Sequence, residues 1–414
     1  MAITLSSITA NEIYGVRSPL PLAFSAGGLG EFLKTITIDL KIWIGDKTTN
    51  KPSTATYSIS LGTNTLGTTL QYYEVDIAEL LREYIDTDAL FVPTNYGSDW
   101  AAWVEVDWNA TSNLDGNFSG SPTIICTNGY RAYEDPNLAL DTYYFPAEVK
   151  VPSEFPYFIT VLDKGVTGAS RVIDTIEIDY DSSPTETTSF GTAGTTTSSL
   201  FKVATLEWFA GDTQATVNLK LGSDTVHSFV VKRICKSKYD NIMVGYVNRV
   251  GVIDYQYFFG KNEKNQTVNR QTYKPALDNR YNTANSQYRI MTANGKLPFT
   301  TNSDWVTEPT KEKIRDLILT EYAFDTGVDV TSFNNLGDVM SVILQEDGGT
   351  ILSESCLDVL AAQVEEGLKY YRYETSPKAI NPTDSEQVMK QDNNELSNYT
   401  LSFEYAYDYI NSVR

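Results

Sequence analysis

A strict alternation of apolar and polar residues near the N-terminus constrains the fold of this chain most strongly. Between Lys34 and Ile44 one set of alternate positions holds Ile36, Ile38, Leu40, Ile42 and Ile44, and the other holds Thr35, Thr37, Asp39 and Lys41. A period of two residues places such sets on opposite faces of a β-strand, whereas a helix repeats every 3.6 residues or so. The segment is therefore predicted to be a strand with one buried face.

Similar apolar runs recur along the chain. They are Thr54–Leu61, Ala101–Trp108, Tyr157–Leu162, Val172–Tyr180, Phe201–Phe209, Thr216–Leu221, Asp224–Ile234, Ile242–Asn248, Ile253–Phe259 and Tyr399–Tyr407. Short strands at this spacing, separated by Gly, Asn, Asp and Pro, favour antiparallel sheets. The predicted fold class is mainly β, with several antiparallel β-sandwich-like domains in tandem and a few short helices.

Helices are predicted at few positions. Asp76 has the character of an N-cap with Glu79 three residues later, and apolar residues follow at helical spacing. A second helix is predicted to begin near Thr307–Pro309, because proline suits the first helical turn. A weaker pattern predicts one further turn at Val359–Leu368. Helix is therefore expected to be a minor component.

The length of 414 residues predicts several domains, since one domain usually spans roughly 100–200 residues. Shifts in composition near Pro146 and near Gly295–Pro298 predict the boundaries. The expected domains are an N-terminal β-sandwich with one short helix at 1–145, a central β-sandwich at 146–296 and a C-terminal α+β domain at 297–414. The tract Asp181–Ser199, rich in Ser, Thr and Gly, is predicted to be a mobile loop of the central domain.

Net charge and hydropathy limit the classes of partner that we expect for this chain. The formal net charge of −21 repels a phosphate backbone, so nucleic acid is not expected as a partner. No apolar run approaches the roughly 20 residues that span a bilayer, and the first residues lack the pattern of a secretory signal. We therefore expect no membrane partner and assembly in a cytoplasm.

Cysteine and histidine usage argues against metal chemistry. Cys126, Cys235 and Cys356 are widely separated, a pattern that suggests neither a disulfide framework nor a zinc site. His227 is the single histidine, which leaves little room for imidazole bases or multi-histidine metal sites. We expect no metal and no cofactor.

Acidic residues two apart on predicted strands offer the one hint of catalysis or calcium binding. These residues are Glu105 and Asp107, and Glu177, Asp179 and Asp181. Any solvated strand face shows such spacing, and the sequence has no calcium-loop, phosphate-loop or nucleophile-elbow motif. The chain is therefore not expected to be an enzyme, and no catalytic residue is assigned.

Two aromatic clusters are candidate contact sites. Trp100 directly precedes a predicted strand and Trp103 lies within it, on the face opposite Trp108, so one tryptophan could be interfacial or stack on a sugar. Tyr246, Tyr255 and Tyr257 lie in a predicted hairpin. Its turn is predicted at Asn248-Arg249-Val250-Gly251. Trp100, Trp103, Tyr246, Tyr255 and Tyr257 are thus candidate interface or glycan contacts, although packing in a core is the more common use of such residues.

Several short motifs, spread over most of the chain, occur in a recognisable order. They are Thr127-Asn128-Gly129-Tyr130, Cys235-Lys236-Ser237-Lys238-Tyr239, Gly245-Tyr246-Val247-Asn248-Arg249-Val250-Gly251, Phe259-Gly260-Lys261, Asp304-Trp305-Val306-Thr307-Glu308 and Leu401-Ser402-Phe403-Glu404-Tyr405-Ala406. In this order the chain resembles virion structural proteins of tailed bacteriophages that infect Bacteroidetes, including the crAss-like phages. The resemblance implies a scaffold role in the virion and supplies no catalytic residues.

The expected function is that of a structural subunit in the tail, neck or baseplate of a phage virion. Such a subunit would form a ring homo-oligomer and contact other virion proteins. The alternative is a host-recognition or glycan-binding β-sandwich protein, which long fibre-type repeats would favour, and the sequence has no internal period. A polysaccharide depolymerase would need a cleft with paired carboxylates or an activated nucleophile, which the motifs do not indicate.

Overall fold

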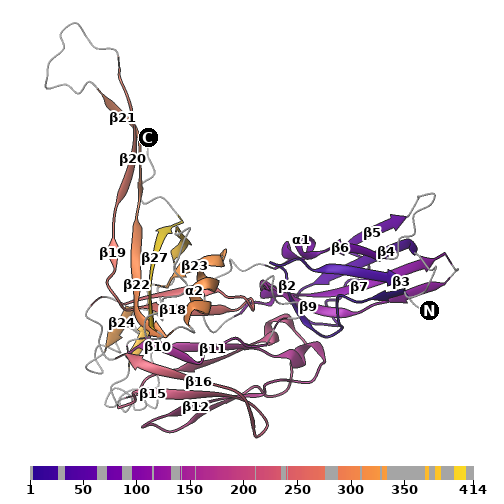
Figure 1. The fold of residues 1–414 in the computed structure, drawn as a ribbon, viewed down its shortest axis with the longest axis horizontal. Coiled ribbons are helices and arrows are strands. Elements are labelled where there is room, and N and C mark those ends of the chain that lie inside the picture. The colour runs from indigo at the N-terminus through magenta and orange to yellow at the C-terminus, as the bar shows by residue number, and fades with distance from the viewer. Residues whose placement is uncertain are drawn as a thin grey trace, which may run out of the picture.

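The computed structural model describes residues 3–26, 33–62, 72–85, 96–113, 116–131, 140, 142–153, 155–209, 211–234, 239, 241–275, 288–307, 310–326, 329–332, 369–372, 378–383 and 396–406. Within these residues the chain is mainly β, with several antiparallel sheets and two α-helices, which confirms the predicted fold class. Figure 1 shows an N-terminal part at one end, central and C-terminal parts together at the other end, and a two-stranded arm that projects from the body.

The N-terminal part packs two sheets around one core. The first has the order β1-β3-β6, from strands Ile3–Leu5, Pro21–Ala26 and Tyr72–Asp76. The second has the order β2-β9-β7-β4-β5, with β8 paired to β7, from strands Ile13–Gly15, Thr123–Thr127, Ala101–Ser112, Leu33–Trp43, Tyr57–Gly62 and Asn117–Gly120. The alternation predicted for 34–44 is confirmed, because Ile36, Ile38 and Leu40 of β4 are buried in this core.

The central part contains a five-stranded sheet and a two-stranded sheet. The larger has the order β10-β16-β15-β12-β13, from strands Glu148–Pro152, Asp224–Ile234, Gln214–Leu221, Thr175–Tyr180 and Glu186–Ser189. The smaller pairs β11, Tyr157–Leu162, with β14, Phe201–Leu206. Short 3-10 helices occur in this part at η2 Lys164–Thr167 and η3 Thr197–Leu200, and in the N-terminal part at η1 Ser98–Trp100, directly before β7.

The C-terminal part is built on a seven-stranded sheet of order β18-β17-β23-β26-β27-β22-β19. Its strands are Ile253–Phe258, Ile242–Val247, Ala323–Asp325, Lys378–Pro382, Leu396–Tyr405, Pro298–Thr307 and Glu263–Lys264. Two further strand pairs are β20, Thr267–Tyr273, with β21, Arg289–Lys296, and β24, Asp329–Ser332, with β25, Lys369–Arg372. The predicted hairpin is present as the antiparallel pair β17 and β18.

The sheet topology corrects the second predicted boundary. Strands β17, β18 and β19 lie in the C-terminal sheet, so the central part does not extend to residue 296. The composition shift near Gly295–Pro298 instead marks the passage from β21 to β22. One hydrophobic core also runs from the central part into the C-terminal part without interruption. The segment before Ile242 is therefore the better boundary between these two sheet systems.

Both predicted helices form at the expected places. Helix α1 is Ala78–Arg82, and the Asp76 carboxylate accepts hydrogen bonds from the backbone N–H groups of Ala78 (3.0 Å) and Leu20 (2.8 Å). The N-cap position is Ile77, one residue after the predicted Asp76, and the Asp76 side chain links the helix start to Leu20 just before β3. Helix α2 is Thr310–Leu319 and buries Ile314 and Leu317. The turn predicted at Val359–Leu368 lies outside the described residues.

The expectation of a mobile loop at Asp181–Ser199 is corrected. The segment forms edge strand β13, which pairs with β12, and it buries Phe190 and Thr197. Near its end, Thr195 donates a 2.6 Å hydrogen bond from its hydroxyl to the Asp46 carboxylate. That bond, together with others from Thr48 and Thr49, holds the pKa of Asp46 well below its usual range. The composition of residues 181–199 predicted a loop because the local sequence does not show contacts with a distant segment, here Asp46 just after β4.

The contrast between buried and exposed residues in this segment gives a direct test. Phe190→Ala is expected to lower the free energy of unfolding by about 3 kcal/mol, the low end for such a change, because it removes from the shared core a ring that is 8% exposed. Thr188→Ala in exposed β13 is the control, with an expected change under about 0.5 kcal/mol. Thermal and urea unfolding measure both. Equal, small effects would show that the segment is a loop after all.

Candidate functional site

The motifs at 127–130 and 245–251 meet at a junction between the N-terminal and C-terminal parts. The hydroxyl of Thr127 donates to the carbonyl of Val250 (3.0 Å), and the N–H of Tyr130 donates to the carbonyl of Arg249 (2.7 Å). Gly251 has a φ of +85°, and a Cβ built there would lie 2.7 Å from the backbone nitrogen of Gly129. Glycine is required here because two backbones approach too closely for any side chain.

An ion-pair network reinforces this junction from helix α2. Arg249 donates to the Asp316 carboxylate from Nε (3.0 Å) and from one terminal nitrogen (2.8 Å), and that same nitrogen donates to Glu312 (2.9 Å). Asp316 is fully buried and also accepts a 2.6 Å hydrogen bond from the Tyr130 hydroxyl. Burial lowers the pKa of Arg249, but the bonds to Asp316 outweigh burial and raise it overall. The guanidinium therefore stays charged and fixed.

Aromatic rings and a second arginine complete the junction. The guanidinium carbon of Arg249 lies 4.1 Å from the centre of the Tyr144 ring, and that of Arg17 lies 5.0 Å from the centre of the Tyr130 ring. Burial raises the pKa of both Tyr130 and Tyr144, so both hydroxyls stay protonated at neutral pH. Arg17 also donates to the carbonyl of Leu319 at the end of α2. Residues far apart in the sequence, from Arg17 to the end of α2, are thus held in contact.

A second buried ion pair ties α2 to β18, and a contact with the Tyr157 hydroxyl reaches the central part. Lys313 donates from Nζ to Asp254 of β18 at 2.8 Å and lies 3.3 Å from the Tyr157 hydroxyl of β11. The Lys313 side chain is only 2% exposed. A buried ammonium with a carboxylate and a phenol nearby could in principle move protons, but such pairs more often fix the orientation of packed elements. Helix α2 is therefore held on two sides by charge pairs.

The structure places all five predicted contact residues in the interior. Trp100, Trp103, Tyr246, Tyr255 and Tyr257 are each at most 1% exposed. The expectation of glycan contact is corrected, because a sugar cannot stack on rings that other side chains already cover. Their large apolar areas fill a core that the central part shares with both of its neighbours.

Strand β7 explains why its tryptophans looked interfacial. Trp103 does lie on the face opposite Trp108, as predicted, and both faces are buried along the first half of the strand. Trp103 stacks on Trp43 with ring centres 6.4 Å apart, and its ring nitrogen donates to the carbonyl of Gly45. Tyr96 joins the same region by stacking on Phe201 of β14. The interface of these residues is thus internal, between the N-terminal and central parts.

The acidic candidates are spread over separate strands. Glu105 pairs with Lys41 (2.8 Å) and Lys51, and Glu177 pairs with Lys220 (2.5 Å). Asp179 accepts from the Thr185 hydroxyl and Asp181 from Thr213, while Asp107 is exposed. Among the described residues no group of three or more His, Cys, Asp or Glu side chains could hold a metal ion. Four of these five carboxylates thus have lysine or hydroxyl partners.

Cys126 and His227 both pack against other side chains. Cys126 is fully buried, and burial raises the pKa of its thiol above its usual value. His227 lies against Tyr143, with ring centres 5.1 Å apart, and burial lowers its pKa. Cys235 and Cys356 lie outside the described residues. None of the described helices is long and apolar enough to cross a membrane.

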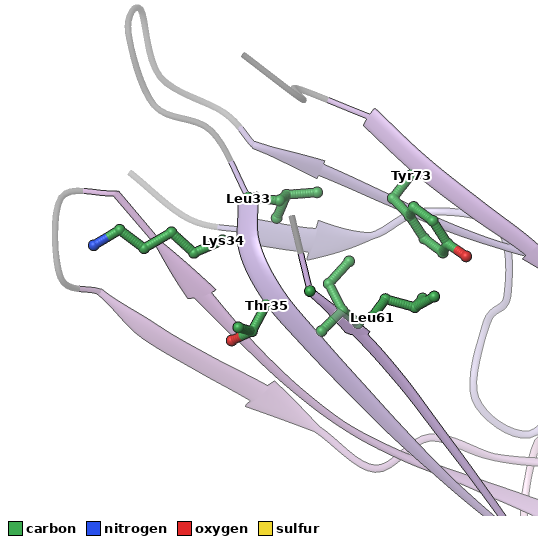
Figure 2. Close-up of a pocket in the computed structure, with 7 residues that line it drawn as sticks. Leu33, Lys34, Thr35, Leu61 and Tyr73 are labelled. Atoms are coloured by element: carbon green, nitrogen blue, oxygen red, sulfur yellow. The ribbon is translucent and has the colours of Figure 1, made fainter. Parts of the chain in front are cut away.

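An apolar pocket opens at the far end of the N-terminal part. It has a volume of about 150 Å³ and is lined by Leu33, Lys34, Thr35, Ile36, Leu61, Gly62 and Tyr73. Figure 2 shows Leu33, Leu61 and Tyr73 around the pocket and Lys34 extending away from it. Its lining offers no carboxylate, imidazole or thiol, so it is suited to an apolar side chain or small apolar ligand rather than to acid–base chemistry.

The most exposed feature of the molecule is the arm, defined as described residues 261–275 and 288–296. Figure 1 shows it projecting from the edge of the C-terminal sheet, where β20 continues from β19 and β21 continues into β22. Every residue of β20 is exposed, and at about 3.4 Å per residue this strand alone is ~24 Å long. Among the described strands, β20 and β21 pair only with each other.

The arm differs from the rest of the chain in both charge and apolar exposure. It carries the basic residues Lys261, Lys264, Arg270, Lys274, Arg289 and Lys296 and one acidic residue, Glu263. The arm is thus +5 in a chain of −21, which leaves −26 elsewhere. It also holds five of the eleven large apolar side chains that the described residues expose: Val268, Tyr273, Tyr288, Ile290 and Met291.

Sequence reasoning missed both the junction pairs and the arm. The pairs join residues far apart in sequence, so no local signal identifies them. The arm did have a signal, an excess of basic residues within 261–296 of an acidic chain, which averaging the charge over the whole sequence conceals.

Comparisons with known proteins add little. No family model and no curated protein matches the chain. The chain has 10% identity to the periplasmic chaperone SfaE, covering 54% of this chain and 96% of that one, with a TM-score of 0.18. It has 9% identity to native Escherichia coli alpha-2-macroglobulin, covering 80% of this chain and 24% of that one, with a TM-score of 0.21. The chain thus spans about a quarter of the macroglobulin's length, and TM-scores this low say nothing about its function.

Proposed function

We propose that this chain is a structural subunit of a tailed-phage virion, which assembles through protein–protein contacts into a ring or layer of the tail, neck or baseplate. The observation that carries the proposal is the arm, an exposed two-stranded ribbon that projects from the body of the molecule. An isolated two-stranded hairpin is marginally stable in water, so a ribbon of this kind is suited to contact with a neighbour. In a ring, such a ribbon can extend from one subunit to the next copy.

The contacts between the N-terminal and C-terminal parts at the junction also support the proposal. Motifs that carry the resemblance to phage virion proteins, at 127–130 and 245–251, lie in direct contact and are braced by α2. A load-bearing subunit must keep its parts in a fixed relation, and buried ion pairs with glycine-mediated backbone contact oppose relative motion of those parts. The motifs therefore have a structural role that fits a scaffold.

Mass spectrometry of purified virions tests the proposed function. The chain is expected among the virion proteins, at a copy number divisible by the symmetry of a ring. Its absence from purified particles would refute the proposal. Presence at only a few copies, together with binding to host-surface glycans, would instead favour the host-recognition alternative.

A further inference from the structure

We propose that the arm is the principal contact between subunits, and that its partner is an acidic surface on the body of a second copy of this chain. The inference rests on the proposed function only in assuming that several copies lie side by side in one particle. It adds which surface makes the contact and what chemistry its partner has.

Charge complementarity identifies the partner. Two copies of a chain with net charge −21 repel each other, so a stable contact needs local positive charge. Since salt screens charges over about 8 Å at physiological ionic strength, the charge within the contact matters more than the total. Arg270, Lys274 and Arg289 form no ion pair with any described residue, whereas Lys261 and Lys296 at the base pair with Glu263 and Glu404.

Apolar side chains among these charges favour a protein partner over a nucleic acid. The strand register places Val268, Arg270 and Ile290 on one face of the ribbon, because Ile290 pairs with Thr272. Met291 lies at the irregularity between the paired positions and is 59% exposed. Covering such side chains is favourable in a protein contact, and the remaining −26 of the chain would repel a phosphate backbone.

The arrangement also defines the type of contact. An arm on one copy that binds the body of the next uses two different surfaces, so the contact is head-to-tail. Repeating it closes a ring when the rotation between copies fits. The rigid junction and the arm's continuity with the seven-stranded sheet would hold that rotation constant from copy to copy.

Charge reversal on the arm tests the proposal. The double variant Arg270→Glu and Arg289→Glu is expected to weaken self-association of the full chain by about tenfold or more, measured by sedimentation velocity over a concentration series. The matched control, Lys220→Glu with Lys232→Glu, makes the same change in net charge on the central part and is expected to leave self-association within about twofold of wild type. Thermal unfolding checks that each variant folds, and the exposed arm positions should leave the melting temperature unchanged.

Cross-linking identifies the partner surface. A zero-length reagent that joins lysine to carboxylate is applied to mixed nitrogen-14 and nitrogen-15 copies, so that links between copies can be recognised by mass. We expect mixed-isotope links from Lys264 or Lys274 to carboxylates outside residues 261–296. Two outcomes of these association experiments would overturn the proposal: a wild-type chain that remains monomeric, and a charge-reversed variant that associates normally. Cross-links between copies that do not involve the arm would also overturn it, as would salt-sensitive binding of the arm to a DNA duplex in place of a second copy.

The same experiments separate this inference from the proposed function. If the chain is absent from virions but the arm variant loses self-association, the virion role falls and the arm contact stands. If the chain is abundant in virions but the arm cross-links only to a different protein, the virion role stands and the present inference falls.

Discussion

Gly251→Ala is expected to lower the free energy of unfolding by about 4 kcal/mol. The φ of +85° at Gly251 costs a residue with a Cβ roughly 1–2 kcal/mol. The new methyl would also lie 2.7 Å from both the backbone nitrogen of Gly129 and the hydroxyl oxygen of Thr127, and such overpacking costs about 1–3 kcal/mol. Because the obstacle is backbone, it cannot move aside cheaply.

Gly222→Ala is the matched control for this prediction. Gly222 has a φ of +61°, and no atom lies within 4 Å of a Cβ built there. It therefore tests the conformational cost alone, with an expected loss of about 1 kcal/mol. Urea unfolding followed by tryptophan fluorescence measures both variants. Equal losses for the two would mean that the close approach of Gly129 and Gly251 does not hold in solution.

The strands of the apolar runs and both helices could be predicted because their signals are local. A period of two residues is set by the backbone itself, so β4 and the β17–β18 hairpin appear where the apolar pattern places them. The Asp76 carboxylate, which accepts from the backbone N–H of Ala78 in the first turn of α1, acts in the same local way. Where side chains of one segment decide the structure, the sequence of that segment is sufficient.

Contacts between distant segments could not be predicted by the same means. The pattern of β7 places Trp103 and Trp108 on opposite faces, but only the structure shows that a second layer covers Trp103. The polar composition at 181–199 gave no hint that Thr195 meets Asp46. The candidate glycan contacts failed for this reason, since exposure depends on what the rest of the chain brings against a strand.

Ion pairs between distant residues could not be predicted from the local sequence either. Arg249 and Asp316 are ordinary charged residues in a turn and a helix, and their meeting depends on the topology of the C-terminal sheet. The arm is the exception, because its charge excess is local. A windowed count of charge would have identified residues 261–296 as basic, although not as a projecting ribbon.

Asp316→Ala is expected to lower the free energy of unfolding by about 3 kcal/mol. Removing one partner of a buried pair leaves the other charge uncompensated, at a cost of roughly 3–5 kcal/mol. Here the loss lies toward the low end, because Arg249 remains 22% exposed and keeps Glu312 as a partner. The Tyr130 hydroxyl also loses its acceptor, so the N-terminal part should loosen from α2 first.

Glu312→Ala is the matched control, since Glu312 lies one turn earlier on α2 and binds the same guanidinium. Its side chain is 29% exposed, so water can replace it and the expected loss is under about 1 kcal/mol. Urea unfolding measures both losses, and hydrogen exchange at residues 127–130 reports whether the junction opens before the sheets unfold. If Glu312→Ala destabilises as much as Asp316→Ala, or if exchange at 127–130 is unchanged in Asp316→Ala, the buried pair is not what holds the junction. A junction that opens first in Asp316→Ala would mean that helix α2 transmits load between the N-terminal part and the sheet that carries the arm.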